Sequence, residues 1–594
     1  MIARLLLTVV CSAIPAALVA QVATVGPDTT ADAAPDPGDV LGQARGAQAR
    51  FERTRLRHAD LSFGGGGGEC DEVVGRFCTS YHEGEWYPQE EAEEIVAERI
   101  SLLSELDSLQ DLLPGDEWIL GQRAWYRADG GDWAGALATA RACTPAPTWR
   151  CSALEGLALH GAGHYGPALG AFETALDLMP PGAALEWRIP ERAVERAVRG
   201  DLRDATTAGP DSLAAALATL WILADPLYLV DGNDRLTEHY ARWTVSTLKE
   251  DARNPYGIRW STDLEELTVR HGWELGWERT IHTMFVGREG AIGHKHPEGR
   301  DYLPSAAAWR DLSAAAPEDL VADRREPRSL YAPRYAPVLL PIESVVAVFP
   351  RGDRTVLVGL PYLPEDTTFH AAHRHPRPWL DAGDQAGMSD RIGLFAVPIA
   401  GGDGSVQIVE AGEGALMLDV PLGDYVVSVE SWSPERRRAG RARMGVRVAR
   451  APEDIATASD ILLLRGTERP PRSLEEALPS ALVRPGVQSS DPLAIAWELS
   501  GLGFRPETVE YELSVERGGR NVFRRIGEFL GLADRPQPLA LSWQEPAPDY
   551  PTHQFRHLNL DLPPLDPGDY RITLTVRTAT RSDVVVTKDF QVVE

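Results

Sequence analysis

Positive charge, cysteine and long apolar runs are all scarce in this sequence of 594 residues. Lys and Arg number 59 against 87 Asp and Glu, which gives a formal net charge of −28 at pH 7. A surface this acidic repels phosphate backbones and anionic lipid headgroups, so we expect no nucleic-acid partner. Beyond residue 20 no stretch stays apolar over the roughly 20 residues that a bilayer requires, so we expect no membrane-spanning helix.

The common catalytic motifs are also missing. His-Glu-x-x-His, Gly-x-Ser-x-Gly, Gly-x-x-x-x-Gly-Lys-Ser/Thr and a twelve-residue calcium loop do not occur. The glycines at 64–68 have no predicted strand before them and no Lys after them, so they indicate a linker rather than a phosphate-binding loop. An enzyme is therefore less expected than a binding protein, and we predict no cofactor.

The N-terminus has the pattern of an export signal, with a basic start, an apolar stretch and a small-residue end at Ala20. We expect residues 1–20 to be removed and the protein to reside in the periplasm or outside the cell. Residues 21–69 are rich in Ala, Asp, Pro and Gly. That composition predicts a flexible leader with a short helix near residues 42–57.

Four cysteines follow the signal, in two pairs that each have seven residues between them. An even number of cysteines in an exported protein favours disulfides, here Cys70–Cys78 and Cys143–Cys151. The alternative is one zinc site with four thiolate ligands, whose cysteines normally lie closer together in the sequence. We therefore predict two disulfides and no metal.

A phrase recurs in the region that follows. Gly131-Asp-Trp-Ala-Gly-Ala-Leu137 corresponds to Gly163-His-Tyr-Gly-Pro-Ala-Leu169, and the second copy continues with Phe172, Ala175 and Pro180. This order of small, aromatic, Ala and Pro positions resembles the tetratricopeptide repeat. The resemblance implies stacked antiparallel helix pairs in a helical domain at residues 70–200, which would bind a protein or peptide on a concave face. The alternative is that these helices only pack against the next domain.

Residues 201–280 combine two predicted helices, 211–224 and 238–250, with aromatic and acidic residues at defined spacing. The order is Trp-x-x-x-Asp-Pro, Asn-x-x-x-x-Glu-His-Tyr, Trp-x-Thr-Asp and Arg-x-Gly. It resembles the GWxTD-motif proteins, a poorly characterised bacterial family, and implies a divergent member because Arg259 stands where the motif has glycine. The matching residues are Trp221, Asp225, Pro226, Asn233, Glu238, Tyr240, Trp260, Thr262, Asp263 and Gly272.

This resemblance carries over no activity, so the chemistry of the residues must be judged directly. Thr and Asp beside a turn can accept backbone N–H groups, and Trp can cap a helical core, which favours a structural role for Trp260, Thr262 and Asp263. The alternative is a hydrolase or metal-dependent enzyme. Its acid and base groups would be Asp225, Glu238, His239 and Asp263.

Residues 281–336 are expected to form a long irregular connection. His294 and His296 lie in it, and His370, His373 and His375 lie beyond it, at spacing that could bind zinc or copper. Neither group has the i, i+4 spacing of a helix face or a nearby carboxylate that completes a familiar ligand set. We therefore predict solvated loop histidines rather than a metal site.

From residue 337 onward, β-branched and alternating segments predict strands. The expected strands are 344–349, 355–359, 392–399, 406–411, 416–420, 425–430, 441–448, 493–499, 508–517, 570–578 and 584–593, with a helical insertion near 525–532. In 441–448, alternation predicts that Ala442, Met444, Val446 and Val448 face a core, and that Arg441, Arg443 and Arg447 face water.

A second phrase recurs in this half of the chain. Leu418-Asp-Val-Pro421 and Gly423-Asp-Tyr425 correspond to Leu560-Asp-Leu-Pro563 and Gly568-Asp-Tyr570. Each copy ends in a Tyr followed by an alternating strand, which is typical of the corner where a Tyr hydroxyl fastens a loop of an immunoglobulin-like sandwich. We therefore predict two such β-sandwiches, at 337–450 and 451–594.

The predicted fold is thus multidomain α + β, with an all-α, tetratricopeptide-like region followed by two immunoglobulin-like β-sandwiches. The expected function is that of an exported non-enzymatic adaptor or scaffold for protein–protein interaction in the bacterial envelope. The hydrolase or metal-dependent enzyme is one alternative. Carbohydrate or cell-wall binding by the sandwiches is another, with thin support from the scattered Trp379, Trp432, Trp497 and Trp543.

Overall fold

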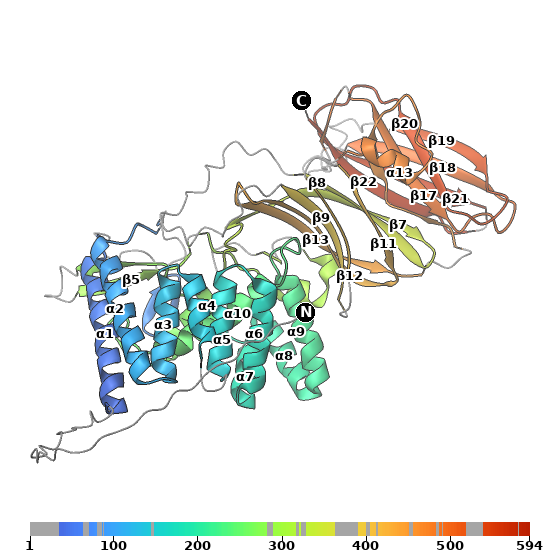
Figure 1. The fold of residues 1–594 in the computed structure, drawn as a ribbon. Coiled ribbons are helices and arrows are strands. Elements are labelled where there is room, and N and C mark those ends of the chain that lie inside the picture. Colours follow the sequence, from blue (N-terminus) through green and yellow to red (C-terminus); the bar gives the residue numbers. More distant parts are fainter. Residues whose placement is uncertain are drawn as a thin grey trace, which may run out of the picture.

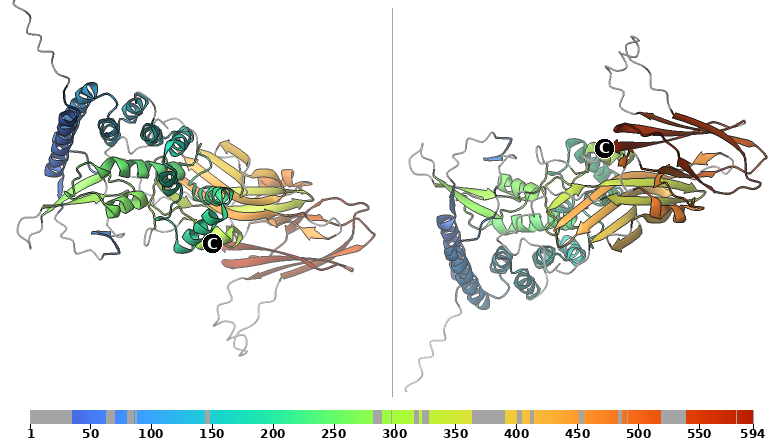
Figure 2. Two further views of the ribbon diagram at one scale, coloured as in Figure 1. Left: turned by 90° about the horizontal axis from the view of Figure 1, so that it is seen from below. Right: turned by 90° about the horizontal axis from the view of Figure 1, so that it is seen from above.

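The protein has a helical N-terminal half and a β-sheet C-terminal half at opposite ends of an elongated molecule (Figures 1 and 2). This confirms the predicted order of helical and β regions. Among the residues that the structure describes, no helix has both the length and the apolar content needed to cross a bilayer. The predicted signal at residues 1–20 lies outside the residues that the structure describes. The computed structural model describes residues 35–62, 70–79, 86, 88–143, 148–281, 289–296, 298–315, 320–321, 328–362, 390–399, 404–410, 414–450, 455–482, 486–489, 491–517, 539–579 and 581–593.

The helices of the N-terminal half pack around one large apolar core and smaller apolar clusters beside it. They are α1 (Pro37–His58), α2 (Glu93–Leu112), α3 (Glu117–Asp129), α4 (Trp133–Arg141), α5 (Trp149–Gly161), α6 (Tyr165–Leu178), α7 (Pro181–Arg188), α8 (Arg196–Ala208), α9 (Pro210–Ala224), α10 (Asp234–Glu250), α11 (Thr262–His271) and α12 (Ala306–Arg310).

Helix α1 includes the short helix predicted near residues 42–57, but the expectation that this part of the chain belongs to a flexible leader is wrong. Val40, Ala44 and Phe51 are buried against the rest of the core, and α1 packs along α2. The Phe51 and Tyr126 rings meet edge-on at 4.9 Å, and the Tyr126 hydroxyl donates to Glu52 at 2.5 Å. Small residues at every third or fourth position let α1 approach α2 closely. The same small residues made its composition similar to that of a linker.

The two copies of the first repeated phrase occupy equivalent places in two antiparallel helix pairs, α3–α4 and α5–α6. Gly131 and Gly163 have φ of 86° and 84°, a left-handed conformation that glycine adopts without strain, and the second helix of each pair begins two residues later. Helix α10 packs against α3 and α5, the first helix of each pair, and against α6. That side of the helix pairs is therefore filled by the chain itself.

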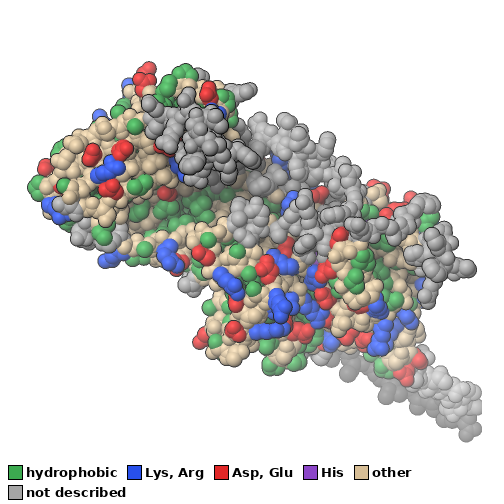
Figure 3. Space-filling model, turned by 180° about the vertical axis from the view of Figure 1, so that it is seen from behind, with side chains coloured by type: hydrophobic (Ala, Val, Ile, Leu, Met, Phe, Trp, Pro, Cys, Tyr) green, Lys and Arg blue, Asp and Glu red, His purple; other side chains and the backbone are tan. Residues whose placement is uncertain are grey.

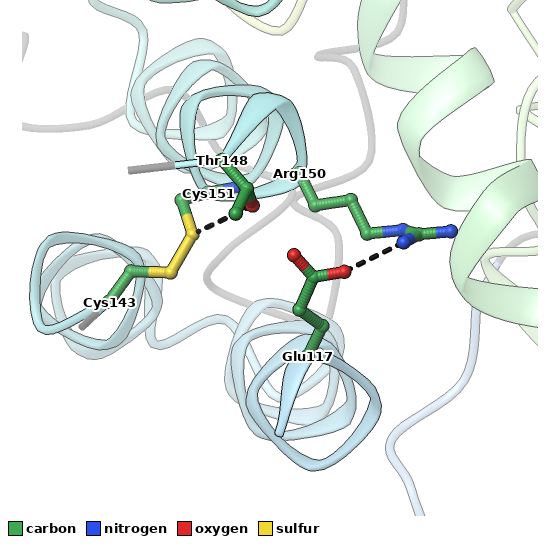
Figure 4. Close-up of a disulfide and its surroundings, with 5 residues drawn as sticks. All are labelled: Glu117, Cys143, Thr148, Arg150 and Cys151. Carbon is green, nitrogen blue, oxygen red and sulfur yellow. Dashed lines mark hydrogen bonds and ion pairs between the residues drawn. A yellow bond between two sulfur atoms is a disulfide. The ribbon is translucent and has the colours of Figure 1, made fainter. Parts of the chain in front are cut away.

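The four cysteines pair as predicted, Cys70 with Cys78 and Cys143 with Cys151, at Cα–Cα distances of 5.4 and 6.1 Å. The second disulfide joins the chain just after α4 to the first turn of α5 (Figure 4). The hydroxyl of Thr148, which caps α5, lies 3.3 Å from the sulfur of Cys151. The Cys143–Cys151 disulfide thus links the two helix pairs.

Replacing both Cys143 and Cys151 by serine is expected to lower the free energy of unfolding by about 2–3 kcal/mol, because the unfolded chain gains the freedom of a short loop. Urea unfolding followed by circular dichroism at 222 nm measures the change. The control replaces Cys70 and Cys78, which close a loop of the same length in a peripheral hairpin. It should shift the midpoint less, because that hairpin can open without unfolding the helices. An unchanged midpoint in the first variant would contradict the role of this link.

The expectation that residues 281–336 form a long irregular connection needs correction, because the described residues of this range include a strand and buried side chains. Strands β4 (Gly276–Ile281) and β5 (Glu289–His294) pair antiparallel, and β1 (Asp60–Ser62) adds to β4 in parallel. Beyond the strands the backbone is irregular, but Tyr302 and Leu303 are buried in the cores that join the helices to the first β-sheet. Apolar residues spaced without a helix or strand period gave no signal of burial.

Each half of the β region contains two sheets that enclose an apolar core. The first pair has the strand orders β10-β9-β12-β13-β6 and β11-β8-β7, and the second has β14-β17-β15 with β20 on β17, and β16-β22-β21-β18-β19. The strands are β6 (Val338–Pro341), β7 (Glu343–Arg351), β8 (Arg354–Tyr362), β9 (Arg391–Pro398), β10 (Ser405–Glu410), β11 (Leu416–Pro421), β12 (Gly423–Ser433), β13 (Arg438–Val448), β14 (Thr457–Ala458), β15 (Leu462–Arg465), β16 (Gly486–Gln488), β17 (Leu493–Ser500), β18 (Thr508–Arg517), β19 (Leu539–Pro546), β20 (Gln554–Leu560), β21 (Gly568–Thr578) and β22 (Val584–Val593).

The two pairs of sheets pack directly on each other. In β8, Leu357 belongs to the first core, whereas Val356 and Val358 point to a third core shared with β17. In β17, Trp497 belongs to the second core and Ala494 to the shared one. Successive strand residues point to opposite faces, so the two inner sheets are buried on both sides. The predicted boundary at residue 450 is therefore followed by a packed interface.

Both predicted tyrosine corners are present. The Tyr425 hydroxyl donates to the Pro421 carbonyl at 3.1 Å, and the Tyr570 hydroxyl donates to the Asp566 carbonyl at 2.9 Å. Each bond spans four residues and fastens the turn that precedes β12 or β21. The repeated phrase therefore has the same structural role in both places.

Strand β13 contradicts the expectation that Arg441 and Arg443 face water. Its alternation holds, since Val446 packs against the first core, although Met444 is 38% exposed. The opposite face carries Arg441 and Arg443 into the helical half, whereas the Arg447 side chain is 79% exposed. Helix α9 ends at this face, and its last carbonyl groups need hydrogen-bond donors. The sequence alone did not show that the arginines of β13 are these donors.

Candidate functional site

The residues that carry the family resemblance lie on α9, α10, α11 and their connecting loops. Asn233 caps α10 by accepting the Leu236 N–H at 2.9 Å, and its side-chain amide donates to the Trp221 carbonyl at 2.7 Å. This amide ties the last turn of α9 to the first turn of α10. Trp221 and Tyr240 are buried in apolar clusters, and the Tyr240 ring lies 5.5 Å from that of Phe172.

Asp225 and Pro226 lie where the helical half meets the β half. The Asp225 side chain is buried and accepts the Leu227 N–H at 3.1 Å. The backbone carbonyls of Asp225 and Pro226 accept hydrogen bonds from the two buried arginines of β13. Burial, reinforced by the nearby Asp234, raises the pKa of the Asp225 carboxyl well above its ordinary value. Asp225 and Pro226 therefore end α9 and connect it to the β half through their backbone carbonyls.

Glu238 projects from α10 into a cavity of the helical half. Arg242 Nε lies 2.6 Å from one carboxylate oxygen, and His160 Nε2 lies 2.8 Å from the other. Burial opposes the ionisation of Glu238, but Arg242 and His160 outweigh it and lower its pKa to about 2. His160 Nδ1 is in turn 2.9 Å from the Thr237 hydroxyl. Glu238 is thus ionised at neutral pH with both oxygens engaged, and accepting a proton would require breaking an ion pair.

The cavity beside Glu238 has a volume of about 90 Å³. Its walls include the indoles of Trp125, Trp133 and Trp273, and Glu274 on another side. Lys249 and Lys295 bind Glu274 at 2.6 and 2.9 Å and, against the effect of burial, hold its pKa below the usual range. Cavities that hold a benzene ring measure about 150 Å³. This cavity therefore suits ordered water or a very small ligand rather than a polypeptide.

The other proposed acid and base groups lie in separate networks. His239 is fully buried, its Nε2 is 2.7 Å from the Trp187 carbonyl, and burial together with Arg235 lowers its pKa to about 3. Asp263 binds Arg76 of a distant hairpin. Asp225, Glu238, His239 and Asp263 therefore have different partners, and they do not converge on a common point.

The ends of α11 explain three further motif residues. Trp260 is 9% exposed and precedes the helix, Thr262 is its exposed first residue, and Asp263 accepts the Leu264 N–H at 2.8 Å. Gly272 ends the helix with φ of 84°, and its carbonyl accepts a hydrogen bond from Lys295 Nζ at 2.6 Å. These contacts support the structural interpretation of the motif.

The prediction of solvated loop histidines is wrong for His294, which lies on β5 and is 6% exposed. The His294 ring stacks on Trp86 at 4.1 Å and lies 3.2 Å from the Glu278 carboxylate, whereas His296 borders the cavity. Among the residues that the structure describes, no three His, Cys, Asp or Glu side chains gather as a metal ion would require. The group at His370, His373 and His375 lies outside these residues.

The tryptophans of the β half contribute mainly to its cores. Trp432 and Trp497 are 4% and 1% exposed, and Trp543 stacks on Tyr511 at 4.8 Å over the second core. Trp379 lies outside the described residues. The described tryptophans therefore form no exposed row that a sugar could stack on.

Sequence reasoning missed the partners of the motif residues. Arg76, His160 and Arg443 are far from the motif in the sequence, and no sequence pattern indicated that they contact it. Arg242 could have been found, because it follows Glu238 by four residues on a predicted helix, the spacing of an intrahelical ion pair.

Comparison with known proteins identifies no family. No family model and no curated protein matches the sequence. Among solved structures, the FN1–FN3 domains of chicken CNTN1 match at a TM-score of 0.14 and 13% identity, covering 43% of this chain and 68% of theirs. Red sea bream transglutaminase matches at 0.12 and 8%, covering 42% and 31%. Escherichia coli alpha-2-macroglobulin activated by porcine elastase matches at 0.12 and 13%, covering 47% and 24%. TM-scores this low do not support an inference about fold or function.

Proposed function

We propose that this chain is an exported, non-enzymatic adaptor or scaffold for protein–protein interaction in the bacterial envelope. In this proposal it is a divergent GWxTD-motif protein with a tetratricopeptide-like helical region and two immunoglobulin-like sandwiches. The export pattern of residues 1–20 and the two disulfides support the compartment. The observation that carries the proposal is that the motif's polar residues join separate parts of the chain.

Three of these joints connect different structural units. Asn233 links α9 to α10, the Asp225 carbonyl accepts from Arg443 of the first sheet at 2.6 Å, and Asp263 binds the hairpin that carries Arg76. Groups that are used in this way are not available for chemistry on a substrate. The Asp225 contact holds the helical half to the β half, and the other two fix elements within the helical half, which supports a scaffold.

The alternatives have less support. A hydrolase would need the acid and base candidates to meet near a substrate, and they lie in separate networks. A sugar-binding sandwich would need exposed aromatic rings, and Trp432 and Trp497 are in cores. On the face that Figure 3 shows, Lys and Arg side chains are interspersed with Asp and Glu rather than gathered in one basic field, which does not favour nucleic acid.

A groove between the two halves suits a protein partner better than the small cavity does. It has a volume of about 950 Å³ and lies between α9, the segment 308–313 and strands β12 and β13. Small side chains of α9, including Ala215, leave room for a polypeptide segment, and Trp309 and Leu312 offer apolar contacts. Arg310 and Asp311 add polar contacts. We propose that a segment of the partner protein binds here, since α10 fills the inner side of the helix pairs.

Site-specific photocrosslinking tests this function. A photoreactive residue at position 310, whose side chain is 60% exposed beside the groove, should yield a discrete crosslinked protein in the envelope of the source bacterium. The matched control is position 571, 57% exposed on the outer sheet of the second sandwich, which should not. Ala215→Trp fills the groove and should abolish the crosslink from position 310. Identical products from both positions, or none from position 310, would contradict an adaptor that uses this groove.

A further inference from the structure

A small hairpin from the N-terminal region is attached to the motif at α11. Its strands are β2 (Glu72–Val74) and β3 (Phe77–Thr79), and the Cys70–Cys78 disulfide closes it. Gly75 and Arg76 form the tip, and Gly75 has φ of 56°. The hairpin lies 187 positions away in the sequence from the aspartate that its tip contacts.

The tip inserts an arginine into a socket around Asp263. Arg76 donates from Nε to one carboxylate oxygen at 2.5 Å and from Nη2 to the other at 2.7 Å. Nη2 is also 3.0 Å from the Ser261 hydroxyl and from the Arg259 carbonyl, and the Arg76 backbone N–H donates to Asp263 at 3.2 Å. A two-pronged pair of this kind has a defined geometry as well as strength. The socket therefore recognises a guanidinium group presented by a turn.

The shape of the tip matches the socket. A Cβ atom on Gly75 would lie 2.4 Å from the Asp263 Cβ, so no larger residue fits before the arginine. Asp263 is 7% exposed, whereas the Arg76 side chain remains 45% exposed. The carboxylate is thus enclosed by the socket and the hairpin, and the arginine approaches it from the solvent side.

The rest of the attachment is small and combines one further ion pair with a few apolar contacts. Arg270 donates to both Glu72 oxygens at 2.8 and 2.9 Å, and the Phe77 ring meets Tyr256 edge-on at 5.2 Å. Val74 is buried, but Val73 is 70% exposed and faces solvent. In each ion pair the hairpin residue is the more exposed member, Arg76 at 45% and Glu72 at 31%, so salt can screen both pairs. A segment held mainly in this way can detach without unfolding the helices beneath it.

We propose that the Asp263 socket is a recognition site for an arginine at the tip of a tight, glycine-preceded turn, and that the chain's own hairpin occupies it in cis. A partner protein that presents the same turn displaces the hairpin and binds α11. The existence of the partner rests on the adaptor function proposed above, whereas the exchangeable occupancy of the socket does not. In this arrangement the motif aspartate acts in binding, and the hairpin competes with the partner.

A cyclic peptide of residues 70–79, closed by its disulfide and labelled with a fluorophore, tests the proposal with purified full-length chain. The Glu72→Ala/Arg76→Ala variant loses both ion pairs of the cis hairpin and should bind the peptide at least tenfold more tightly than the wild type. Adding Asp263→Asn to that variant should abolish binding. The peptide with Val73→Ala should bind like the parent peptide, and the peptide with Arg76→Ala should not bind.

Fluorescence anisotropy at increasing peptide concentration measures these affinities, and circular dichroism shows that each variant is folded. Equal binding to the wild type and the double variant, no binding to the double variant, or binding that ignores Asp263→Asn would each overturn the proposal. The assay contains no envelope component. A failure of the crosslinking experiment with success here would therefore reject the proposed adaptor groove and leave the socket intact.

Discussion

Replacing Arg443 by alanine is expected to lower the free energy of unfolding by about 3–5 kcal/mol, because Glu430 would remain as a buried, uncompensated carboxylate. The two side chains are 1% and 0% exposed, and Nη2 lies 3.0 Å from the carboxylate oxygen. Arg443 also donates to the carbonyl groups of Leu223 and Asp225 at the end of α9. The same substitution therefore removes a main polar contact between the helical and β halves.

Urea unfolding followed by far-UV circular dichroism measures this loss. Arg447→Ala is the matched control on the same strand, since the ion pair of Arg447 with Asp424 is exposed and should contribute little to stability. Arg443→Met combined with Glu430→Gln removes both charges and should recover part of the loss. If Arg443→Ala were no more destabilising than Arg447→Ala, the buried contact would not hold the two halves together.

The contribution of Asp234 to the stability of the protein is expected to fall as the pH rises from about 4 to about 7. This residue is fully buried, and burial raises its pKa to about 7 even though Tyr331 and Tyr335 donate to its carboxylate at 2.6 and 3.3 Å. In the unfolded chain the pKa is about 3.9. Between these values the folded state holds a proton that the unfolded chain has lost, so a rising pH favours unfolding. A shift of about 3 units corresponds to about 4 kcal/mol at most.

Asp234→Asn removes this titration and retains an oxygen that can accept from a tyrosine hydroxyl. Thermal unfolding at pH 5 and pH 8 is the measurement. We expect the wild type to lose clearly more in melting temperature between these pH values than the variant does. Asp424→Asn changes an exposed aspartate and should leave the wild-type pH dependence intact. Parallel curves for the wild type and Asp234→Asn would show that Asp234 does not titrate in this range.

Sequence patterns located most of the elements around the site. The helices α9 and α10 were predicted within a few residues because apolar side chains repeat at the helical period, and the β13 alternation was predicted in the same way. The tyrosine corners were found because the same short phrase occurs before Tyr425 and Tyr570. In each case the signal and the structure it predicts lie within one stretch of chain.

The failures concern which surfaces meet. The helix near residues 42–57 was predicted, but it was assigned to a flexible leader because small residues resemble a linker until a partner helix is known. Arg441 was assigned to water because a charged residue on a strand is usually solvated, and the acceptors at the end of α9 are more than 200 positions away. The candidate acids were left as one possible site because their partners, Arg76 for Asp263 and His160 for Glu238, could not be seen in the motif.

The order of amino acids alone was enough to determine the halves of the molecule, the cysteine pairs, the strand alternation and the turns, because those depend on periodicity and backbone preference over a few neighbouring residues. Only the folded chain decided which charges are buried and what neutralises them, since Arg443 reaches Asp225 across 218 positions and Arg76 reaches Asp263 across 187. The physical reason is that a buried charge is tolerated only beside a partner, and the partner is supplied by packing between distant segments.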